Sequence, residues 1–344
     1  MMKLDDREWQ EFKIGDTFET DKGIYLHKKN IIEGNNPYVS AKTGNNGVGN
    51  YIGNKALFNG NCITVEKINF SAYYQPHPFY CSHDVSVLFT KRLSKYSALF
   101  ISHMIMKQGI KYSYGRQAQL NVTNRQSILL PVTDLGEIDY NFMELYAKNY
   151  EKNKKAIYLK YCKNKLSTIK EKNISKLQEC EWKPFYIKEI FDNPQRGKRI
   201  VDKNHIEGKT PLVSSYGQGN GVTHFIGNEE KIRKFSNCLS IANGGSSAGK
   251  TFFHPYTFIA ADHVTQCWNR ELNEYQYLFL ATAMTKALTG KYSFSHEISD
   301  PRLAKERIML PATDSGEPDY LYMEQYIKNL MIAKYNSYLE YVNK

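Results

Sequence analysis

Three short patterns in the sequence contain residue types that could carry chemistry. Residues 244–251 match G-x-x-x-x-G-K-[ST], a phosphate-binding pattern that must lead from a buried strand into a helix. The strand-like residues 238–242 precede it, but residues 252–258 are aromatic and contain Pro255, which predicts a strand where the helix should be. We therefore interpret the pattern as a flexible turn whose Lys250 could contact a phosphate group.

The other two patterns also fall short of a catalytic motif. Asn36-Pro37-Tyr38 lacks the second proline of the N-P-P-Y motif of amino-methyltransferases, and no glycine-rich cofactor turn precedes it. Asp84 and Asp262 each follow an apolar run, and we interpret them as turn or packing residues. The sequence contains no acids and lysine at nuclease spacing and no cysteine–histidine set at zinc spacing. It therefore predicts no catalytic residue and no metal ligand in this chain.

Composition and charge narrow the class of protein. The chain has 344 residues, a formal net charge of +11 and a pI of about 9.1. Its 41% hydrophobic content is enough for folded cores and excludes a disordered chain. The sequence has no apolar run of about 18 residues for a transmembrane helix, and its first residues do not form a signal peptide. We expect a soluble cytoplasmic protein of two domains with no membrane partner, and the charge fits an anionic partner such as nucleic acid.

The chain contains an internal repeat. Residues 46–54 correspond to residues 220–228 at an offset of 174, and residues 130–140 correspond to residues 310–320 at an offset of 180. Other matches lie between these in the same order, so chance does not explain them. The chain is therefore two diverged copies of one unit of about 170 residues.

Each copy combines a strand-rich part with a long helix. Short apolar runs separated by Gly, Asn and Pro predict strands and turns, with one internal helix at residues 96–108 and 274–289. After the N-cap candidates Asp139 and Asp319, apolar residues recur every three or four positions. We expect an α+β fold in which two pseudo-two-fold-related domains are separated by an antiparallel pair of long helices. The expected parts are a first domain at residues 1–138, a helix at 139–180, a second domain at 181–318 and a helix at 319–344.

Two similar domains on a rigid spacer suit a target that repeats at a fixed distance, as the half-sites of a DNA duplex do. The copies differ most in loops rich in Asn, Gln, Arg, Lys and Ser, side chains that contact phosphates and base edges. These loops are residues 42–47, 111–121, 195–199, 216–221 and 291–302. Diverged loops on a shared frame predict that each copy binds a different short sequence of double-stranded DNA.

Several motifs of the second copy occur in an informative order. They are Gly197-Lys198-Arg199, Pro211-Leu212-Val213-Ser214, the Asn220-Gly221-Val222 turn, residues 243–253 and residues 310–320. In this order the chain resembles the specificity (S) subunits of type I and type IIB (BcgI-like) restriction–modification enzymes, over its whole length. The resemblance implies two target-recognition domains, each reading one half of a bipartite DNA target. The first copy departs from it at residues 66–74, which lack the glycines of 243–251.

The resemblance also implies that this chain is a non-catalytic subunit. The two helices would space the domains and dock a partner, either a separate methyltransferase or a fused methyltransferase–nuclease. S-adenosylmethionine and Mg²⁺ would belong to that partner, so we expect no cofactor in this chain.

The candidate DNA contacts lie on the diverged loops and beside the glycine-rich turn. We expect contacts to phosphate or guanine from Arg116, Arg196, Lys198, Arg199 and Lys250, and contacts to base edges from Gln117, Gln119, Asn121, Gln218, Asn243 and His296. Further candidates are Lys42, Asn45, Lys67, Tyr114, Ser246, Lys291 and Arg302.

Two alternatives from other classes stay open at this point. A twin-site enzyme would use Asp84 and Asp262 and would need two pockets that perturb these carboxylates. A bivalent scaffold for a protein or a glycan would show no salt-dependent affinity for DNA. The DNA hypothesis instead requires the diverged loops to gather on a basic face.

Overall fold

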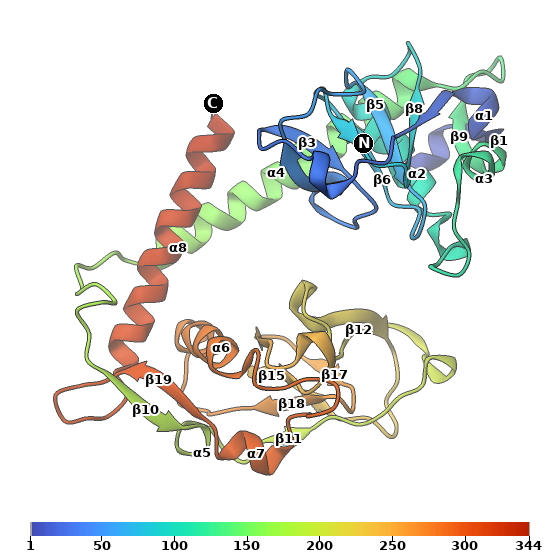
Figure 1. Cartoon of the computed structure of the whole chain (residues 1–344). Coiled ribbons are helices and arrows are strands. Elements are labelled where there is room, and N and C mark those ends of the chain that lie inside the picture. The colour runs from blue at the N-terminus through green and yellow to red at the C-terminus, as the bar shows by residue number, and fades with distance from the viewer. Residues whose placement is uncertain (1, 344) are drawn as a thin grey trace. The chain divides into compact units, whose positions relative to one another are not determined.

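The computed structural model describes residues 2–343. Residue 1, where the first predicted domain begins, and residue 344, where the last predicted helix ends, lie outside the described residues. The chain divides into two compact units, Met1–Tyr158 and Leu159–Lys344, with the boundary inside the long helix α4 (Tyr140–Thr168) (Figure 1). No helix among the described residues is long and apolar enough to cross a membrane.

The described residues of the first unit form three small sheets, short helices and the longer internal helix α2 (Lys95–Met106). Its sheets have the strand orders β1-β9, β2-β8-β5-β6 and β4-β3-β7. The strands are β1 (Glu8–Lys13), β2 (Glu19–Lys22), β3 (Asn36–Val39), β4 (Val48–Ile52), β5 (Cys62–Glu66), β6 (Ala72–Gln75), β7 (Tyr80–Cys81), β8 (Val85–Phe89) and β9 (Ser127–Val132). The helices before α4 are α1 (Ile14–Thr17), α2 (Lys95–Met106) and α3 (Leu120–Arg125).

The second unit repeats this arrangement. Its sheets have the orders β10-β19, β11-β18-β15-β16 and β13-β12-β17-β14. The strands are β10 (Trp182–Tyr186), β11 (Gln195–Arg196), β12 (Glu207–Val213), β13 (Val222–Ile226), β14 (Lys234–Phe235), β15 (Cys238–Ala242), β16 (Thr251–His254), β17 (Phe258–Ala260), β18 (Val264–Cys267) and β19 (Arg307–Pro311). The helices are α5 (Ile187–Ile190), α6 (Glu274–Leu288), α7 (Asp300–Ala304) and α8 (Tyr320–Asn343).

The repeat predicted from the sequence is confirmed, and so is the α+β class. The sheets β2-β8-β5-β6 and β11-β18-β15-β16 have equivalent strand orders, and β3–β7 and β12–β17 are parallel pairs at equivalent places. The structure also excludes a phosphate-binding loop of this type at residues 244–251, because strand β16 directly follows the glycine-rich turn and occupies the place of the required helix.

In each unit one four-stranded sheet, β2-β8-β5-β6 in the first and β11-β18-β15-β16 in the second, is covered on both faces. Every residue of its central strand is buried, in β5 as in β15, which explains their continuous apolar runs. One face packs against the internal helix, where Ile101 of α2 and Leu280 of α6 are fully buried. The other face packs against the second sheet around Val87 in the first unit and Val264 in the second. Each unit is thus a helix–sheet–sheet sandwich that fixes its loops at the strand ends.

Both predicted N-caps are confirmed. Asp139 Oδ1 accepts a hydrogen bond from the backbone N–H of Phe142 at 2.8 Å, and Asp319 Oδ1 accepts one from Tyr322 at 2.9 Å. A capping carboxylate satisfies a free N–H of the first turn and suits the helix dipole. The two long helices therefore begin where the sequence predicts.

The prediction that the first long helix continues to residue 180 is wrong, because α4 ends at Thr168. Side chains of α8 bind the backbone of the following residues instead. Asn329 accepts from the Lys172 N–H at 3.2 Å and donates to its carbonyl at 2.7 Å. Gln325 donates to the carbonyl of Lys170 at 2.9 Å. These contacts replace the helical hydrogen bonds that the segment gives up.

The antiparallel course of the chain beside α8 is nevertheless present within the second unit. Tyr161 of α4 packs edge-on against Tyr335, with ring centroids 6.1 Å apart. Further along the chain, the carbonyl of Ser175 accepts a hydrogen bond from Tyr322 Oη at 2.9 Å. Tyr322 lies near the start of α8 and Tyr335 lies further toward its end, so the chain runs antiparallel to α8. Part of the predicted spacer is thus helical, and residues 169–181 form a non-helical segment that ends in a turn at residues 177–179.

Candidate nucleic-acid interface

Three of the predicted loops of the second unit meet around Gly244. Ser215 Oγ donates to the Gly244 carbonyl at 2.8 Å, which joins the loop after β12 to the glycine-rich turn. The Ile298 N–H donates to the carbonyl of Asn243 at 2.9 Å, which joins the loop before α7 to the same turn. Segments that are distant in sequence, 29 residues apart in the first contact, therefore form one continuous surface at the end of the sheets.

Arg196 holds this surface together from within. Its Nη2 donates to the Ile298 carbonyl at 3.2 Å and lies 3.4 Å from Glu297 Oε2. The backbone N–H of Arg196 donates to Asp300 Oδ2 at 3.2 Å. These partners use a large part of its hydrogen-bonding capacity, so the structure gives Arg196 a role inside the loop cluster.

Asn243 is fully buried, which contradicts its expected direct contact with a base edge. With the amide turned to satisfy all its neighbours, its nitrogen donates to Thr265 Oγ1 and to the Ile241 carbonyl, both at 3.2 Å, and its oxygen accepts from Arg196 Nε at 3.0 Å. Thr265 in turn donates to Asp300 Oδ1 at 2.7 Å. The side chain thus supports the loops from within, and these hydrogen bonds leave its amide no free group for a base edge.

A glycine places the basic residues that follow β11. The N–H of Gly197 donates to the Val264 carbonyl at 2.8 Å, and a Cβ here would collide with the carbonyl oxygens of Ala260 and Ala261. Gly23 meets the carbonyls after β7 in the same way in the first unit. Only glycine permits this close approach of two backbones. It turns the chain so that the next two residues, Lys198 and Arg199, are exposed.

The tips of two equivalent loops carry exposed aromatic rings. Ser113 and Arg116 exchange backbone hydrogen bonds across a tight turn, and Tyr114 at its tip is 81% exposed. Ser293 and His296 form the same turn in the second unit, and its Phe294 is 85% exposed. Phe294 is not among the predicted contacts, although its alignment with Tyr114 in the repeat is the signal that identifies it.

The remaining predicted residues of loop 111–121 are at the surface or nearly so. Gln119 and Asn121 are exposed at the start of α3, and Gln117 is half-buried with its amide donating to the Tyr114 carbonyl at 3.1 Å. In the second unit Gln218, Ser246 and Arg302 are exposed and Lys250 is half-buried.

The loop after β3 is a rigid turn. Asn45 and Asn46 both have positive φ angles, 47° and 53°, a conformation that asparagine tolerates better than most residues. The amide of Asn45 donates to the Val48 carbonyl at 3.1 Å, and that of Asn46 to the Tyr74 carbonyl at 2.9 Å. Lys42 beside them is exposed. The asparagines hold the turn, so the lysine is its freer contact group.

The two acids of the twin-site alternative have different surroundings. Asp84 lies 2.6 Å from Lys67 Nζ and 3.2 Å from His83 Nε2. Asp262 has His263 Nε2 at 3.9 Å, and that histidine is 3.2 Å from Glu297 through its Nδ1. Lys67 was expected to contact DNA, but in the structure it forms an ion pair with Asp84. Because the two acids do not share one environment, the structure does not favour a duplicated active site.

Lys291 lies away from the loop cluster, on an apolar groove of the second unit. Its Nζ is 2.8 Å from Glu306 Oε2, and Tyr292 Oη donates to the same carboxylate at 2.5 Å. Burial acts to raise the pKa of Glu306, but the hydrogen bonds from Lys291 and Tyr292 outweigh it and lower that pKa. The sequence signal for this pairing is weak, because the partners are 15 residues apart on different elements.

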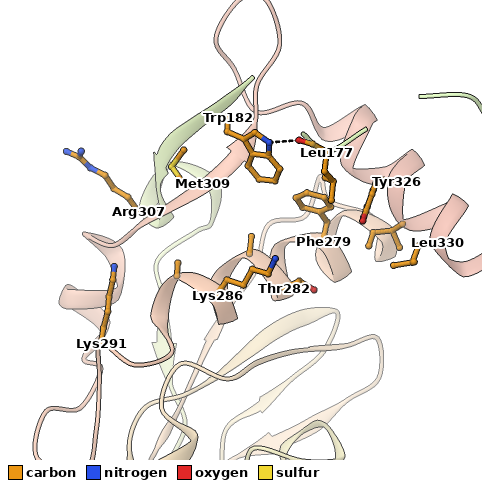
Figure 2. A pocket seen from close by; sticks show the side chains of 13 residues that line it. Leu177, Trp182, Phe279, Thr282, Lys286, Lys291, Arg307, Met309, Tyr326 and Leu330 are labelled. Atoms are coloured by element: carbon orange, nitrogen blue, oxygen red, sulfur yellow. Dashed lines mark hydrogen bonds between the residues drawn. The ribbon is translucent and has the colours of Figure 1, made fainter. Parts of the chain in front are cut away.

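The groove itself lies between α6, α8 and the β10–β19 ribbon, and its volume is about 530 Å³ (Figure 2). Trp182 stacks on Phe279, and Tyr326 meets the same phenylalanine edge-on. Trp182 Nε1 donates to the Leu177 carbonyl at 2.8 Å, which fixes the indole ring at the rim. Met309 is 48% exposed in the same wall.

The same aromatic group recurs in the first unit. Trp9 stacks on Phe100, and Tyr146 meets Phe100 edge-on. Trp9 Nε1 donates to the Leu4 carbonyl at 3.0 Å, as Trp182 does to Leu177. The copies have thus kept this surface while their loops diverged.

Within the described residues no group of acids, histidines and cysteines could hold a metal ion.

Comparison with known proteins agrees with the duplicated fold. The family model of the type I restriction modification DNA specificity domain matches the chain twice, at residues 6–159 and 179–340. The chain is 33% identical over 331 residues to the type II restriction enzyme specificity subunit S.BcgI of Heyndrickxia coagulans, and the match covers 94% of both chains.

Two solved structures are also similar to the chain. The type I restriction–modification S subunit from M. genitalium is 17% identical, with a TM-score of 0.46 over 99% of this chain and 94% of that one. The HsdS subunit from Thermoanaerobacter tengcongensis is 14% identical, with a TM-score of 0.32 over 96% and 91%. From the two matches of the family model and the extent of the identity to S.BcgI, the chain belongs to the family of restriction–modification DNA specificity subunits.

Proposed function

We propose that this chain is the non-catalytic subunit that recognises a bipartite sequence of double-stranded DNA for a restriction–modification complex. Each unit would read one half of the target. One observation carries the proposal: in the second unit, segments that differ between the copies gather at one end of the sheets (the loop end), on a frame that the first unit shares. A shared frame with different loops suits two different readings of one kind of ligand.

The proposed phosphate contacts are the cations that the fold leaves at the surface of the loops. In the second unit these are Lys198, Arg199, Arg302 and the half-buried Lys250. A cluster of such cations neutralises phosphates and releases counterions, so binding should weaken as salt rises. Arg116 and Lys42 would act in the same way in the first unit.

The proposed base contacts lie at the loop tips. Gln218 and His296 in the second unit, and Gln117, Gln119 and Asn121 in the first, offer donors and acceptors to base edges. Tyr114 and Phe294 add apolar surface that can contact thymine methyl groups or wedge between base steps. We keep Ser246 and Asn45 as secondary contacts, and we assign Arg196, Asn243 and Lys67 to the support of the loops.

We infer that the shared aromatic group of each unit, which borders the groove in the second unit, docks the methyltransferase partner, separate or fused to a nuclease. A surface that is the same in both copies should bind two partner surfaces of the same kind. A surface that differs between the copies should bind two different ligands or sequences. In the second unit Lys286, Lys291 and Arg307 line the apolar groove, and Figure 2 shows Lys286 among the apolar side chains. The matching partner surface is an apolar segment flanked by acidic residues.

The chemistry of modification would then belong to that partner. S-adenosylmethionine and Mg²⁺ would bind there, and this chain would supply only the address on the DNA. Residues 1–138 and 181–318 would act as the recognition domains, with residues 139–180 and 319–344 as the spacer. The proposed function places the chain with the DNA in the cytoplasm.

The test is selection of random-sequence duplex DNA by the chain, alone and with the methyltransferase encoded beside it, at fixed near-physiological salt. Enrichment of two short blocks with a constant gap supports the proposal and identifies the target. Exchange of loop 291–302 should change one block and leave the other, because each unit reads its own half. If neither form selects or binds DNA, the proposal fails and the scaffold alternative gains.

The docking step has its own test. Trp182→Ala in the groove of the second unit should weaken capture of the methyltransferase, and Trp9→Ala in the equivalent aromatic group of the first unit should do the same. Phe294→Ala on the loop end is the matched control, because it removes an exposed aromatic ring outside these aromatic groups. Equal capture by all three variants would refute docking at the aromatic groups without touching the DNA proposal.

A further inference from the structure

The second unit contains a cavity that the proposed function does not use. Its volume is about 440 Å³, and it opens beside the edge strand β11 between the two sheets. Residues of β11, β14, β15 and β18 line it, together with the turn between β14 and β15, the segment after β18 and Tyr277 of α6. None of the predicted DNA contacts is among its lining residues. The cavity is therefore distinct from the loop cluster described above.

Gln266 of β18 lies in the wall of this cavity with an unsatisfied amide. The side chain is fully buried, yet neither its oxygen nor its nitrogen has a hydrogen-bond partner among residues 2–343. A buried amide without partners destabilises a fold, and native proteins rarely keep one without a reason. An occupant of the cavity that offers both a donor and an acceptor would remove this cost.

The first unit shows that the frame does not need a glutamine at this place. Gln266 pairs with Ser240 of β15, and Val87 pairs with Thr64 of β5 at the equivalent register. Val87 is fully buried and packs with Phe58 and Phe89. The same fold is thus built with an apolar residue in one copy. The glutamine is a feature of the second copy alone, as expected for a ligand-binding residue.

The other walls suit a flat ring. Phe235 and Trp268 line the cavity with aromatic surface, and Gln195 on the edge strand, the register partner of Gln266, adds a second amide beside it. Arg270 lines it as an exposed cation. Aromatic side chains stack on bases, an amide can bind a base edge through two hydrogen bonds, and arginine binds phosphate.

We propose that this cavity binds a nucleobase, with Gln266 contacting its hydrogen-bonding edge and Arg270 contacting the attached phosphate. The base could belong to a free nucleotide or to an unpaired nucleotide of DNA, and both sources present the same chemistry. The proposal goes beyond recognition of the duplex by the loops and does not depend on it.

The experiment compares the full chain with its Gln266→Val variant, which installs the residue that the first unit carries. The probes are the four nucleoside 5′-monophosphates and a duplex with one unpaired nucleotide, each titrated by calorimetry and by thermal unfolding. The wild type should bind at least one probe, and the variant should bind that probe more weakly by a factor of roughly ten or larger. The unliganded variant should unfold at a higher temperature than the unliganded wild type, because it buries no unsatisfied amide.

A second variant, Arg270→Gln, separates the two contacts. It should weaken binding of the monophosphate but leave binding of the matching nucleoside unchanged, because only the phosphate contact is lost. Binding of the free monophosphate alone would identify a free nucleotide as the source, and preference for the unpaired duplex over the fully paired one would identify DNA.

Two results would overturn the proposal. The wild type could bind none of the probes, in which case water fills the cavity, or it could bind them no better than Gln266→Val. Selection of a duplex target by both proteins in either case would leave the proposed function intact, so the two failures are distinguishable.

Discussion

The buried histidine of the second unit makes acid stability a sharp test of the structure. His254 is fully buried, and its Nε2 lies 2.7 Å from Ser240 Oγ. Burial lowers the pKa of His254 from 6.5 to about 4, because the charged ring would lose its hydration. The first unit solves the same position with an amide, since Gln75 Nε2 donates to Thr64 Oγ1 at 2.9 Å. We therefore predict that His254→Gln protects the second unit against acid.

The sign and size follow from proton linkage. Above pH 6.5, the ordinary pKa, His254 is neutral in the folded and unfolded chain, so it does not change stability. As the pH falls, the unfolded chain binds a proton that the folded chain refuses until about pH 4. At about pH 4.5 the folded state should have lost about 2.5 kcal/mol through this one group. His254→Gln should remove that loss.

The assay is urea unfolding of wild type and variant at about pH 7.5 and about pH 4.5, with hydrogen exchange of β15 and β16 reporting the second unit separately. The difference in stability between the two proteins cancels the contribution of the carboxylates, which also titrate in this range. Gln75→His is the matched control and should create the same acid loss in the first unit. If wild type and His254→Gln lose equal stability between the two pH values, the linkage argument is wrong.

Three further predictions concern the loop end. The double variant Lys198→Gln, Arg199→Gln should reduce the slope of log K against log salt by about 1.8, as expected for two lost phosphate contacts, measured by fluorescence anisotropy; an unchanged slope would remove both from the interface. Gly197→Ala should destabilise the second unit by more than about 1 kcal/mol in urea unfolding, since its Cβ meets two carbonyl oxygens; wild-type stability would contradict the close approach. Phe294→Ala should weaken target binding roughly tenfold with little effect on stability, because the ring is exposed; unchanged affinity would exclude the ring from the interface.

Local patterns were enough to predict the repeat, the class of fold and the helix starts. N-caps such as Asp139 act within three residues of the chain, so their signal is present in the sequence itself. The buried central strands read as apolar runs for the same local reason. The family and its DNA target class followed from the order of motifs along the chain, which also needs no third dimension.

The fate of individual side chains was decided by contacts between distant segments. Arg196 meets Glu297 across 101 residues, and no local pattern announces that pairing. Lys67 meets Asp84, and Asn243 is covered by loops that approach it from both directions. A basic or polar residue on a predicted loop can therefore be a support or a contact, and only the fold distinguishes the two.

The helix after Asp139 shows the same division of information. Its start is encoded by the cap and its apolar stripe, but its end at Thr168 is set by α8 side chains that take up the following backbone. The sequence by itself determined the duplicated frame, the position of the diverged loops and the kind of ligand they suit, because these depend on residue type and order. The tertiary structure alone decided which polar groups stay exposed, since burial and pairing depend on segments that only folding brings together.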